Sequence, residues 1–203
     1  MNINRLQEQL QFLQEIDKLK AVLRKSQIGD CSRLENSAEH SWHVAIMALV
    51  LSEYANERID ILKTVKMLLI HDIVEIDTGD TSLYSSARAS QAEKEKKAAE
   101  RIFGILPDDS RSELLDLWVE FEGKKTPESK FAAAVDRLEP LLRNYYSEGY
   151  TWKKFNITAK KVIAANQHIR DGSEHLWEFA TELIGRSVEK GYLMEEENAA
   201  IQI

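Results

Sequence analysis

Apolar residues recur every three or four positions along most of this chain, which is the spacing typical of amphipathic helices. The first stripe predicts a helix that ends at Arg24, and it consists of Leu6, Leu10, Leu13, Ile16, Leu19 and Leu23. Residues 29–33 include a glycine, an aspartate and a serine, and they are predicted to form a loop. Only eight glycines and three prolines occur in the 203 residues. The pattern therefore favours an all-α fold in a single domain.

A capping signal predicts where the second helix begins. Asn36 is a favoured N-cap residue, and Glu39 follows it at the distance of a capping box. We expect this helix to continue to about Glu57. Its apolar stripe is expected to face the core, and it consists of Trp42, Ile46, Leu49 and Val50.

The same criteria predict the remaining helices. The expected helices cover residues 60–72 and, as a polar and solvated helix, about 82–103. After a turn at 107–109, a further helix ends at 123, followed by a helix at 127–145 and two shorter helices near 158–168 and 173–191. Thr126 followed by Pro127 is a strong start signal, because a proline at the first helical position gives up no hydrogen bond. Pro140 is expected to kink that helix and to free the carbonyl of Asp136. Residues 1–193 are assigned to the domain and residues 194–203 to an acidic tail that can fray.

Composition narrows the classes of function. The chain carries 27 Lys and Arg against 34 Asp and Glu, a formal net charge of -7. This balance argues against binding to a nucleic-acid polymer, which requires a basic surface. No apolar run is long enough for a membrane span, and the N-terminus lacks the basic and apolar parts of a signal peptide. The single cysteine, Cys31, excludes an internal disulfide framework. We therefore expect a cytoplasmic protein.

Three charged sites occur in unusual surroundings. His71 and Asp72 directly follow an apolar run, Asp136 follows small and apolar residues, and His40 lies in the first turn of its predicted helix. Burying an imidazole or a carboxylate costs free energy unless the group is paired, hydrogen-bonded or bound to a metal. A His-Asp pair at a helix end can also be a satisfied helix terminus. The two additional placements favour a common explanation.

A metal site would supply that explanation. Two imidazoles and two carboxylates form a mixed nitrogen and oxygen shell that suits a divalent transition metal, with positions left open for water. Such an ion can lower the pKa of a bound water and withdraw charge from a phosphoryl oxygen. The sequence therefore predicts one divalent ion, and manganese, cobalt, iron, nickel, copper and zinc all suit this shell.

The spacing of these residues resembles the H…HD…D signature of the HD-domain metal-dependent phosphohydrolases. Thirty residues separate His40 from His71-Asp72, and 63 residues separate Asp72 from Asp136. Three surrounding segments are similar to the 5'-deoxynucleotidase branch of that family, namely residues 35–42, 71–80 and 134–140. The resemblance covers about residues 4–185 and implies an all-α HD-domain helical bundle.

The resemblance also implies a role for individual residues. The metal ligands would be His40, His71, Asp72 and Asp136. Glu75 lies one helical turn beyond His71, so it could reach a water near the ion as a general base or orienting group. The alternative for Glu75 is an ordinary exposed helix glutamate. Asp80 would orient water or protonate the leaving oxygen, and its alternative is a simple turn aspartate.

Two arginines are candidates for binding the substrate. Arg24 matches a family arginine that would hold phosphate with its bidentate fork, and the alternative is a surface arginine at a helix end. Arg33 could help to hold an anion, with a solvated loop arginine as the alternative. The relatives have a tryptophan soon after the matching arginine, whereas this chain has Lys25-Ser26-Gln27. That difference concerns recognition of base and sugar and leaves the metal chemistry unaffected.

Other reactive or aromatic residues receive no catalytic role. His43 points about 60° away from His40 around the helix, so it is expected to pack or hydrogen-bond, or to line a pocket. Trp42 and Trp177 are assigned to packing. His168 and His175 lie away from the signature and are not expected to bind the metal. Cys31 has no neighbouring base, which leaves thiol catalysis unsupported.

The predicted activity is metal-dependent hydrolysis of a small phosphomonoester. By resemblance, the leading substrate is a deoxynucleoside 5'-monophosphate and the protein is a homodimer. One alternative is another HD-type reaction on pyrophosphate or another phosphate ester, although no extended basic cluster or extra histidine pair supports it. A second alternative is a non-catalytic helical module that binds a metal or nucleotide. Glu75 and Asp80 argue against that module, because a structural metal needs no additional carboxylate directed at water.

Overall fold

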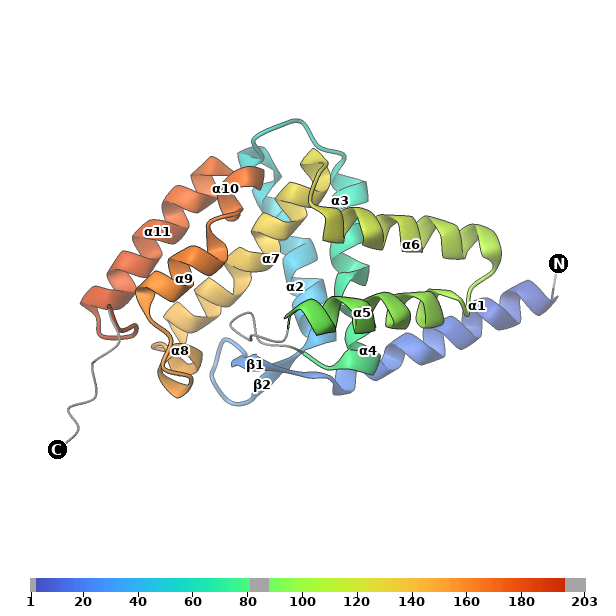
Figure 1. Cartoon of the computed structure of the whole chain (residues 1–203), viewed down its shortest axis with the longest axis horizontal. Coiled ribbons are helices and arrows are strands. Elements are labelled where there is room, and N and C mark those ends of the chain that lie inside the picture. Colours follow the sequence, from blue (N-terminus) through green and yellow to red (C-terminus); the bar gives the residue numbers. More distant parts are fainter. Residues whose placement is uncertain (1–2, 81–87, 196–203) are drawn as a thin grey trace.

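Helix α7 (Pro127–Tyr146) runs through the middle of the molecule and begins at the predicted cap (Figure 1). The hydroxyl of Thr126 accepts a hydrogen bond from the N–H of Ser129 over 3.3 Å, and Pro127 occupies the first helical position. The helix continues past Pro140 to Tyr146. The computed structural model describes residues 3–80 and 88–195, and helices dominate both ranges.

The other elements confirm the all-α fold class, with one small hairpin added. The α-helices are α1 (Ile3–Ile16), α2 (Ser37–Leu51), α3 (Ile61–Ile70), α4 (Glu75–Thr78), α5 (Arg88–Phe103), α6 (Asp108–Gly123), α8 (Tyr150–Lys154), α9 (Ala159–Asn166), α10 (Ile169–Gly172) and α11 (Glu174–Glu189). The 3-10 helices are η1 (Asp17–Ala21), η2 (Ser52–Tyr54) and η3 (His71–Val74). Part of the predicted helix at 82–103, and residues 196–203 of the predicted tail, lie outside the described residues. Met194 still belongs to the folded body, because its carbonyl accepts a 2.8 Å hydrogen bond from the N–H of Ala159.

The predicted capping box at the start of α2 is confirmed. Oδ1 of Asn36 accepts from the N–H of Glu39 over 2.9 Å, and Oε2 of Glu39 accepts from the N–H of Asn36 over 3.2 Å. The helix ends at Leu51, earlier than expected, because residues 52–54 tighten into η2 and Ala55 adopts an extended conformation. This box fixes where the first turn of α2 begins, and therefore where His40 lies.

The prediction that the first helix ends at Arg24 is wrong. Helix α1 stops at Ile16, and strand β1 (Leu23–Gln27) pairs antiparallel with β2 (Leu34–Asn36). Within β1 the side chains alternate, so that Arg24 and Ser26 face inward while Leu23 and Lys25 are exposed. This period of two is that of a strand, and the short apolar run before it masked the change. The strand directs Arg24 toward the centre of the molecule.

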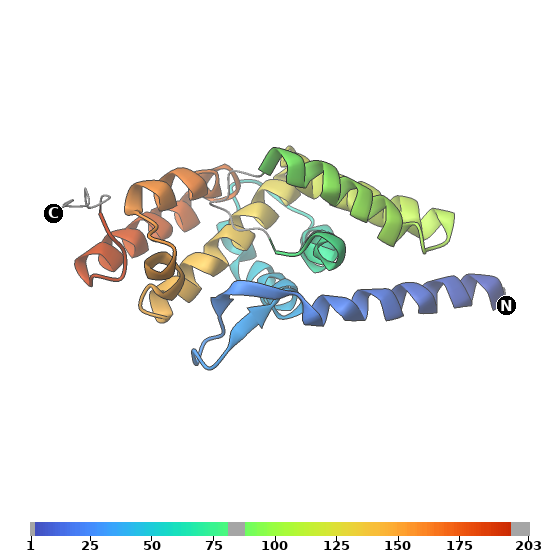
Figure 2. The same cartoon turned by 60° about the horizontal axis from the view of Figure 1, so that its bottom comes forward.

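The predicted core faces of α1 and α2 are also wrong. Trp42 is 62% exposed, and the other exposed members of the two predicted stripes are Leu6, Leu10, Leu13, Leu23, Ile46, Leu49 and Val50. Helix α2 buries the opposite side, including His40, Val44 and Ala48. Apolar residues surround most of α2, so periodicity could not select the buried face. Helix α1 runs beside α5 (Figure 2), and its buried residue, Phe12, stacks on Phe103 of α5.

The core forms where helices from distant parts of the chain meet α7. Helix α7 packs against α2, α3, α6, α10 and α11. Its fully buried residues include Phe131, Val135 and Leu138, which surround the position of Asp136. Trp177 is half-buried and packs against this core, as expected. Within residues 3–80 and 88–195, the apolar part of each helix is too short to cross a bilayer.

Candidate metal centre

Four side chains that are far apart in the sequence meet near the middle of α7. His40 lies in the first turn of α2, His71 and Asp72 begin η3 directly after α3, and Asp136 lies in α7. The packing of α2 and α3 against α7 brings these side chains together. The structure therefore places all four predicted ligands in one cluster.

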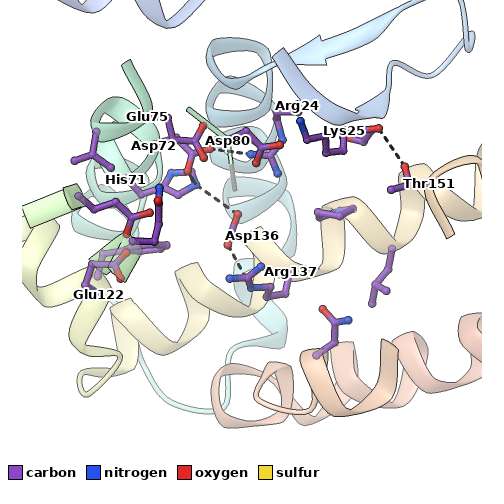
Figure 3. A pocket seen from close by; sticks show the side chains of 18 of the residues that line it. Arg24, Lys25, His71, Asp72, Glu75, Asp80, Glu122, Asp136, Arg137 and Thr151 are labelled. Carbon is purple, nitrogen blue, oxygen red and sulfur yellow. Dashed lines mark hydrogen bonds and ion pairs between the residues drawn. The ribbon is translucent and has the colours of Figure 1, made fainter. Parts of the chain in front are cut away.

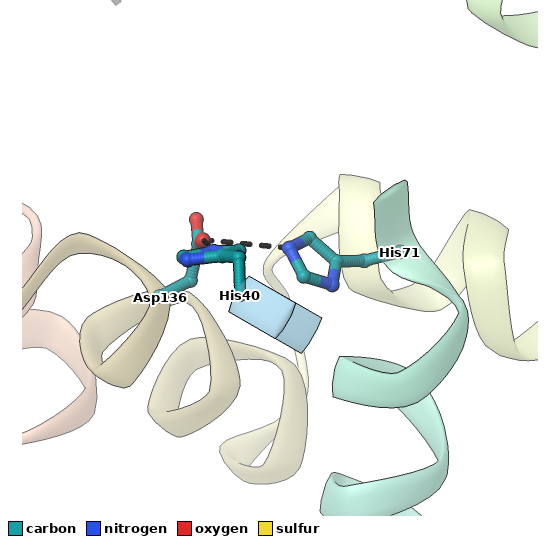
Figure 4. Close-up of side chains that lie close together, drawn as sticks. All are labelled: His40, His71 and Asp136. Atoms are coloured by element: carbon teal, nitrogen blue, oxygen red, sulfur yellow. Dashed lines mark hydrogen bonds and ion pairs between the residues drawn. The ribbon is translucent and has the colours of Figure 1, made fainter. Parts of the chain in front are cut away.

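Oδ1 of Asp136 is the atom shared by the closest contacts (Figure 4). It lies 2.9 Å from Nε2 of His40 and 3.4 Å from Nε2 of His71. One ligand atom from each of these three residues lies within 4.8 Å of the others. Asp72 joins them, with Oδ1 3.1 Å from Nε2 of His71 and Oδ2 4.0 Å from Nε2 of His40. Small adjustments would give all four the bond lengths of about 2.0–2.2 Å that divalent transition metals require.

The second nitrogen of each imidazole fixes the direction in which Nε2 points. Nδ1 of His71 lies 2.8 Å from the carbonyl oxygen of Leu68, and it donates to that oxygen. Nε2 of His71 is then an acceptor, and it is buried without a hydrogen bond from the described residues. Nδ1 of His40 lies 3.4 Å from Oε2 of Glu139. Both imidazoles thus direct Nε2 into the cluster, which is the arrangement seen around metal-binding histidines.

The cluster favours a positive charge at its centre. Burial opposes protonation of His40, but hydrogen bonds to Asp136 and Glu139 prevail and raise its pKa to about 10. Burial opposes protonation of His71 as well, whereas the charges of Asp72 and Asp136 raise its pKa. A divalent cation would balance the charge of the same carboxylates in place of the protons on the two imidazoles. The unpaired nitrogen of His71, this negative charge and the nitrogen and oxygen donor set all fit a divalent transition metal.

Glu75 and Asp80 border the same cavity as the cluster (Figure 3). The hydroxyl of Ser37 donates to Oε2 of Glu75 over 2.6 Å, which fixes that carboxyl group. Burial, followed by the charge of Asp72, raises the pKa of Glu75 to about 8. Burial also raises the pKa of Asp80. Both carboxyl groups lie beside the cluster in surroundings that help them to hold a proton.

The two predicted substrate-binding arginines lie in different places. Nη1 of Arg24 donates to Oδ2 of Asp72 over 3.0 Å, and the side chain borders the cavity. Arg33 is exposed and pairs with Glu39 through two contacts of 2.6 and 2.8 Å. Arg33 does not border the cavity. The structure thus brings Arg24, but not Arg33, to the metal cluster.

Sequence reasoning missed a buried charged network behind His40. Glu35 and Glu139 are almost completely buried, and both approach Nδ1 of His40. Nε of Arg143 donates to Oε1 of Glu139 over 2.5 Å, and Nδ1 of His43 lies 3.2 Å from the same oxygen. Glu139 stands between a leucine and a proline, three residues after Asp136 and four before an arginine. The cost of burying an unpaired charge could have identified it from that context.

A cavity of about 300 Å³ opens beside the cluster. This volume lies at the lower end of the range of small-molecule sites. Apolar walls come from residues such as Phe121, Leu141 and Trp152, and polar groups come from residues such as Asn144 and Thr151. The cavity therefore combines a candidate metal centre with surfaces that suit a small organic molecule.

Comparisons with known proteins agree with the fold. The family model of the HD domain matches residues 16–177. The 5'-deoxynucleotidase HDDC2 of Homo sapiens is 31% identical over 136 residues, which make up 66% of this chain and 65% of that protein. The chain thus spans slightly less than two thirds of the length of this relative. The 5'-deoxynucleotidase hdd1 of Schizosaccharomyces pombe is 24% identical over 90% of this chain and 85% of its own length.

Solved structures show the same architecture. A predicted metal-dependent phosphohydrolase from Magnetospirillum magnetotacticum superimposes with a TM-score of 0.91 and 48% identity, covering 94% of this chain and 96% of its own. A conserved hypothetical protein from Pyrococcus furiosus superimposes with a TM-score of 0.65 and 23% identity, covering 87% of this chain and 99% of its own. The second comparison extends the fold to more distant sequences.

Proposed function

This chain belongs to the HD domain family, and we propose that it removes the phosphate from a deoxynucleoside 5'-monophosphate in a metal-dependent hydrolysis. The observation that carries the proposal is the meeting of His40, His71 and Asp136 around one point beside a cavity. The names of the human and yeast relatives support the reaction class. The name of the Magnetospirillum protein supports the dependence on a metal.

The four proposed ligands are His40, His71, Asp72 and Asp136. When bound, a divalent ion supplies a Lewis acid for a phosphoryl oxygen and lowers the pKa of a coordinated water. Nδ1 of His71, held by the carbonyl of Leu68, keeps Nε2 of that ring directed at the ion. The donor set admits manganese, cobalt, iron, nickel, copper or zinc.

The remaining residues handle protons and hold the reacting groups. In its ionised form Glu75 accepts the proton of the attacking water, and Ser37 holds its carboxyl group in position through the 2.6 Å hydrogen bond. Asp80 orients the water or donates a proton to the leaving oxygen. Arg24 stabilises negative charge near the phosphate while its hydrogen bond holds Asp72. These roles together account for hydrolysis of a phosphomonoester.

The proposal is tested by phosphate release from a panel of nucleoside 5'-monophosphates, in deoxy and ribo forms. Metal-stripped protein is assayed alone and after separate additions of manganese and cobalt, with His71→Ala as the control for the metal site. We expect metal-dependent release that His71→Ala abolishes, with the deoxy substrates preferred. Protein that binds one equivalent of metal but releases no phosphate from any member of the panel would refute the proposed reaction.

Glu75→Gln separates the proposed chemistry from metal binding. This change removes the proton acceptor and preserves the size of the side chain. Since general-base groups contribute about 10²–10⁴-fold to rates, we expect turnover to fall by that factor while metal content stays at the wild-type level. Turnover at the wild-type rate would show that Glu75 is not the general base.

We also propose that the protein is a homodimer that uses the exposed apolar stripe of α2. Trp42, Ile46 and Leu49 lie on one side of this helix and are 41–62% exposed. Contiguous apolar surface is uncommon on monomers and marks contact with another molecule. We expect Leu49→Glu to convert the dimer to a monomer in size-exclusion chromatography with light scattering. Val119→Glu, at an exposed apolar position on α6, is the matched control, and a monomeric wild type would exclude the proposed dimer.

The proposed compartment is the cytoplasm. The argument rests on the single cysteine, Cys31, whose side chain is exposed and free. A reducing compartment keeps such a thiol from forming disulfides. Fractionation of cells that express the tagged chain tests this assignment, and recovery in an oxidising compartment would contradict it.

A further inference from the structure

Arg137 is a cavity residue whose hydrogen-bonding capacity is largely unused. It follows Asp136 on α7, borders the cavity and is 20% exposed (Figure 3). Its ion pair with Asp136 is a long one, with 3.8 Å between Nε of Arg137 and Oδ2 of Asp136. The same Nε is buried and lacks a hydrogen-bond acceptor there. A buried donor in this state costs free energy, and a ligand that accepts its hydrogen bond would remove that cost.

Two other arginines near the cluster already bind carboxylates of the protein. Arg24 donates to Asp72 over 3.0 Å, and Arg143 donates to Glu139 over 2.5 Å. These contacts hold the carboxylates in place and occupy part of each guanidinium. The contact of Arg137 lies beyond hydrogen-bond distance. Its planar fork therefore remains able to bind an external acceptor with two parallel hydrogen bonds.

The position of Arg137 links the cavity to the metal cluster. Oδ1 of Asp136 faces the two imidazoles, whereas Oδ2 faces Arg137. The guanidinium and the cluster thus lie on opposite sides of one carboxylate and border one cavity. An anion bound in the cavity beside the cluster would meet both.

Both cationic and acidic residues act on His168, whose pKa responds to the charge of Arg137. Burial, followed by the charges of Arg137 and Lys124, lowers the pKa of His168 to about 4. His168 is consequently neutral at neutral pH and does not compete with the guanidinium for an anion. The nearby acidic residues Asp136 and Asp171 counter this effect only in part. Lys124 also borders the cavity, so this wall carries two cationic residues beside Asp136.

We infer that Arg137 binds a phosphate oxygen of the substrate directly, as a cationic contact separate from Arg24. The substrate named here rests on the proposed function. The inference assigns two tasks to two arginines, since Arg24 holds Asp72 and Arg137 binds the incoming phosphate. Inorganic phosphate, the product of the proposed reaction, carries the same oxygens and should bind through the same side chain.

The test measures binding of inorganic phosphate to the metal-loaded protein by isothermal titration calorimetry, with metal content determined on the same samples. We expect Arg137→Gln to raise the Kd for phosphate by about 10- to 100-fold, which is the range for losing a charge-assisted hydrogen-bonded contact. Arg137→Lys keeps the positive charge but lacks the planar guanidinium, so its Kd for phosphate should lie between those of wild type and Arg137→Gln. The matched control is Arg186→Gln, which removes an exposed arginine of α11 that pairs with Glu182.

The outcomes separate direct binding from positioning of Asp136. Weaker phosphate binding at unchanged metal content supports the inference. Loss of metal in proportion to loss of phosphate affinity overturns it, because Arg137 would then act only through Asp136. The inference is also overturned if Arg137→Gln binds phosphate as tightly as the control Arg186→Gln does. If Arg137→Gln unfolds in thermal melts, Arg137→Lys decides between the same outcomes.

Steady-state kinetics distinguish this inference from the proposed function. A wild type that hydrolyses nucleotides, with KM and phosphate inhibition unchanged in Arg137→Gln, overturns the inference and leaves the function standing. A wild type that hydrolyses no monoester but binds phosphate through Arg137 supports the inference and overturns the function.

Discussion

Glu139→Gln is expected to weaken metal binding while leaving the protein folded. Glu139 is fully buried and lies 3.4 Å from Nδ1 of His40, on the side of the ring away from the cluster. Glutamine has nearly the same shape but carries no charge. The substitution therefore removes the negative charge that stabilises the orientation of His40, without opening a cavity.

The size of the effect follows from the contacts that Glu139 makes. Loss of a partner behind a metal-binding histidine costs about 10- to 100-fold in metal affinity, which corresponds to about 1.4–2.7 kcal/mol. Breaking a buried ion pair can cost about 3–5 kcal/mol in stability. Arg143 is 19% exposed and lies 3.8 Å from Glu35. After the substitution its positive charge is therefore still stabilised by water and by the carboxylate of Glu35. We therefore expect the free energy of unfolding to fall by a smaller amount, about 1.5–3 kcal/mol.

Metal affinity is measured by competition with a chelator, and stability is measured by urea unfolding of the metal-free protein. The matched control is Glu182→Gln, which removes an exposed carboxylate of α11. A variant that loses stability but binds metal within twofold of wild type would refute the reasoning. In that case Glu139 would stabilise the fold without orienting His40.

Three further predictions follow from local features. Asn36→Ala removes the N-cap of α2 and should lower stability by about 1 kcal/mol, or Tm by about 2–4 °C, whereas Asn36→Ser should retain the cap; equal Tm values in calorimetry would contradict this. The pKa of His168 is lower in the folded protein than in the unfolded chain, so below about pH 6.5 the unfolded chain binds more protons. The stability that His168 contributes is therefore complete above about pH 6.5 and is lost as the pH falls toward 4. Because His168 is only half-buried, we expect wild type to lose about 1 kcal/mol more than His168→Gln between pH 7.5 and pH 5 in urea unfolding, and parallel pH profiles would exclude this effect. When free metal is present at 100 times its Kd, removing it should lower the free energy of unfolding by about 2.7 kcal/mol, or Tm by about 5–11 °C. A Tm that is unchanged by a chelator, in protein that demonstrably binds metal, would contradict the proposed ligand set.

Helix boundaries were predictable where a side chain decides them locally. Asn36 and Thr126 accept hydrogen bonds from backbone N–H groups within three residues of themselves. The caps of α2 and α7 could therefore be predicted from the local sequence. The strand at residues 23–27 could not be identified with the same certainty. Its partner, β2, begins seven residues later, and a short apolar stripe before it has the spacing of a helix.

The residues of the cluster could be predicted from the sequence, but the side chains packed around them could not. The placement of His71, Asp72 and Asp136 among apolar residues indicated that they needed a partner, and the structure brings them together with His40. The buried face of α2 depended on which neighbours that helix meets, which its own nearly uniform apolar sequence does not specify. The roles of Glu35 and Glu139 depended on the same packing, because each approaches His40 from a different element.

The separation of His40 from Asp136 by 96 positions in the chain has a consequence for synthesis. A nascent chain that ends before α7 carries His40, His71 and Asp72 but lacks both Asp136 and the helix against which α2 and α3 pack. Contacts between such distant positions form late, after the cost of closing a long loop has been met. Assembly of the complete ligand set must therefore await synthesis of α7, so an ion held by all four side chains would report that this part of the fold is finished.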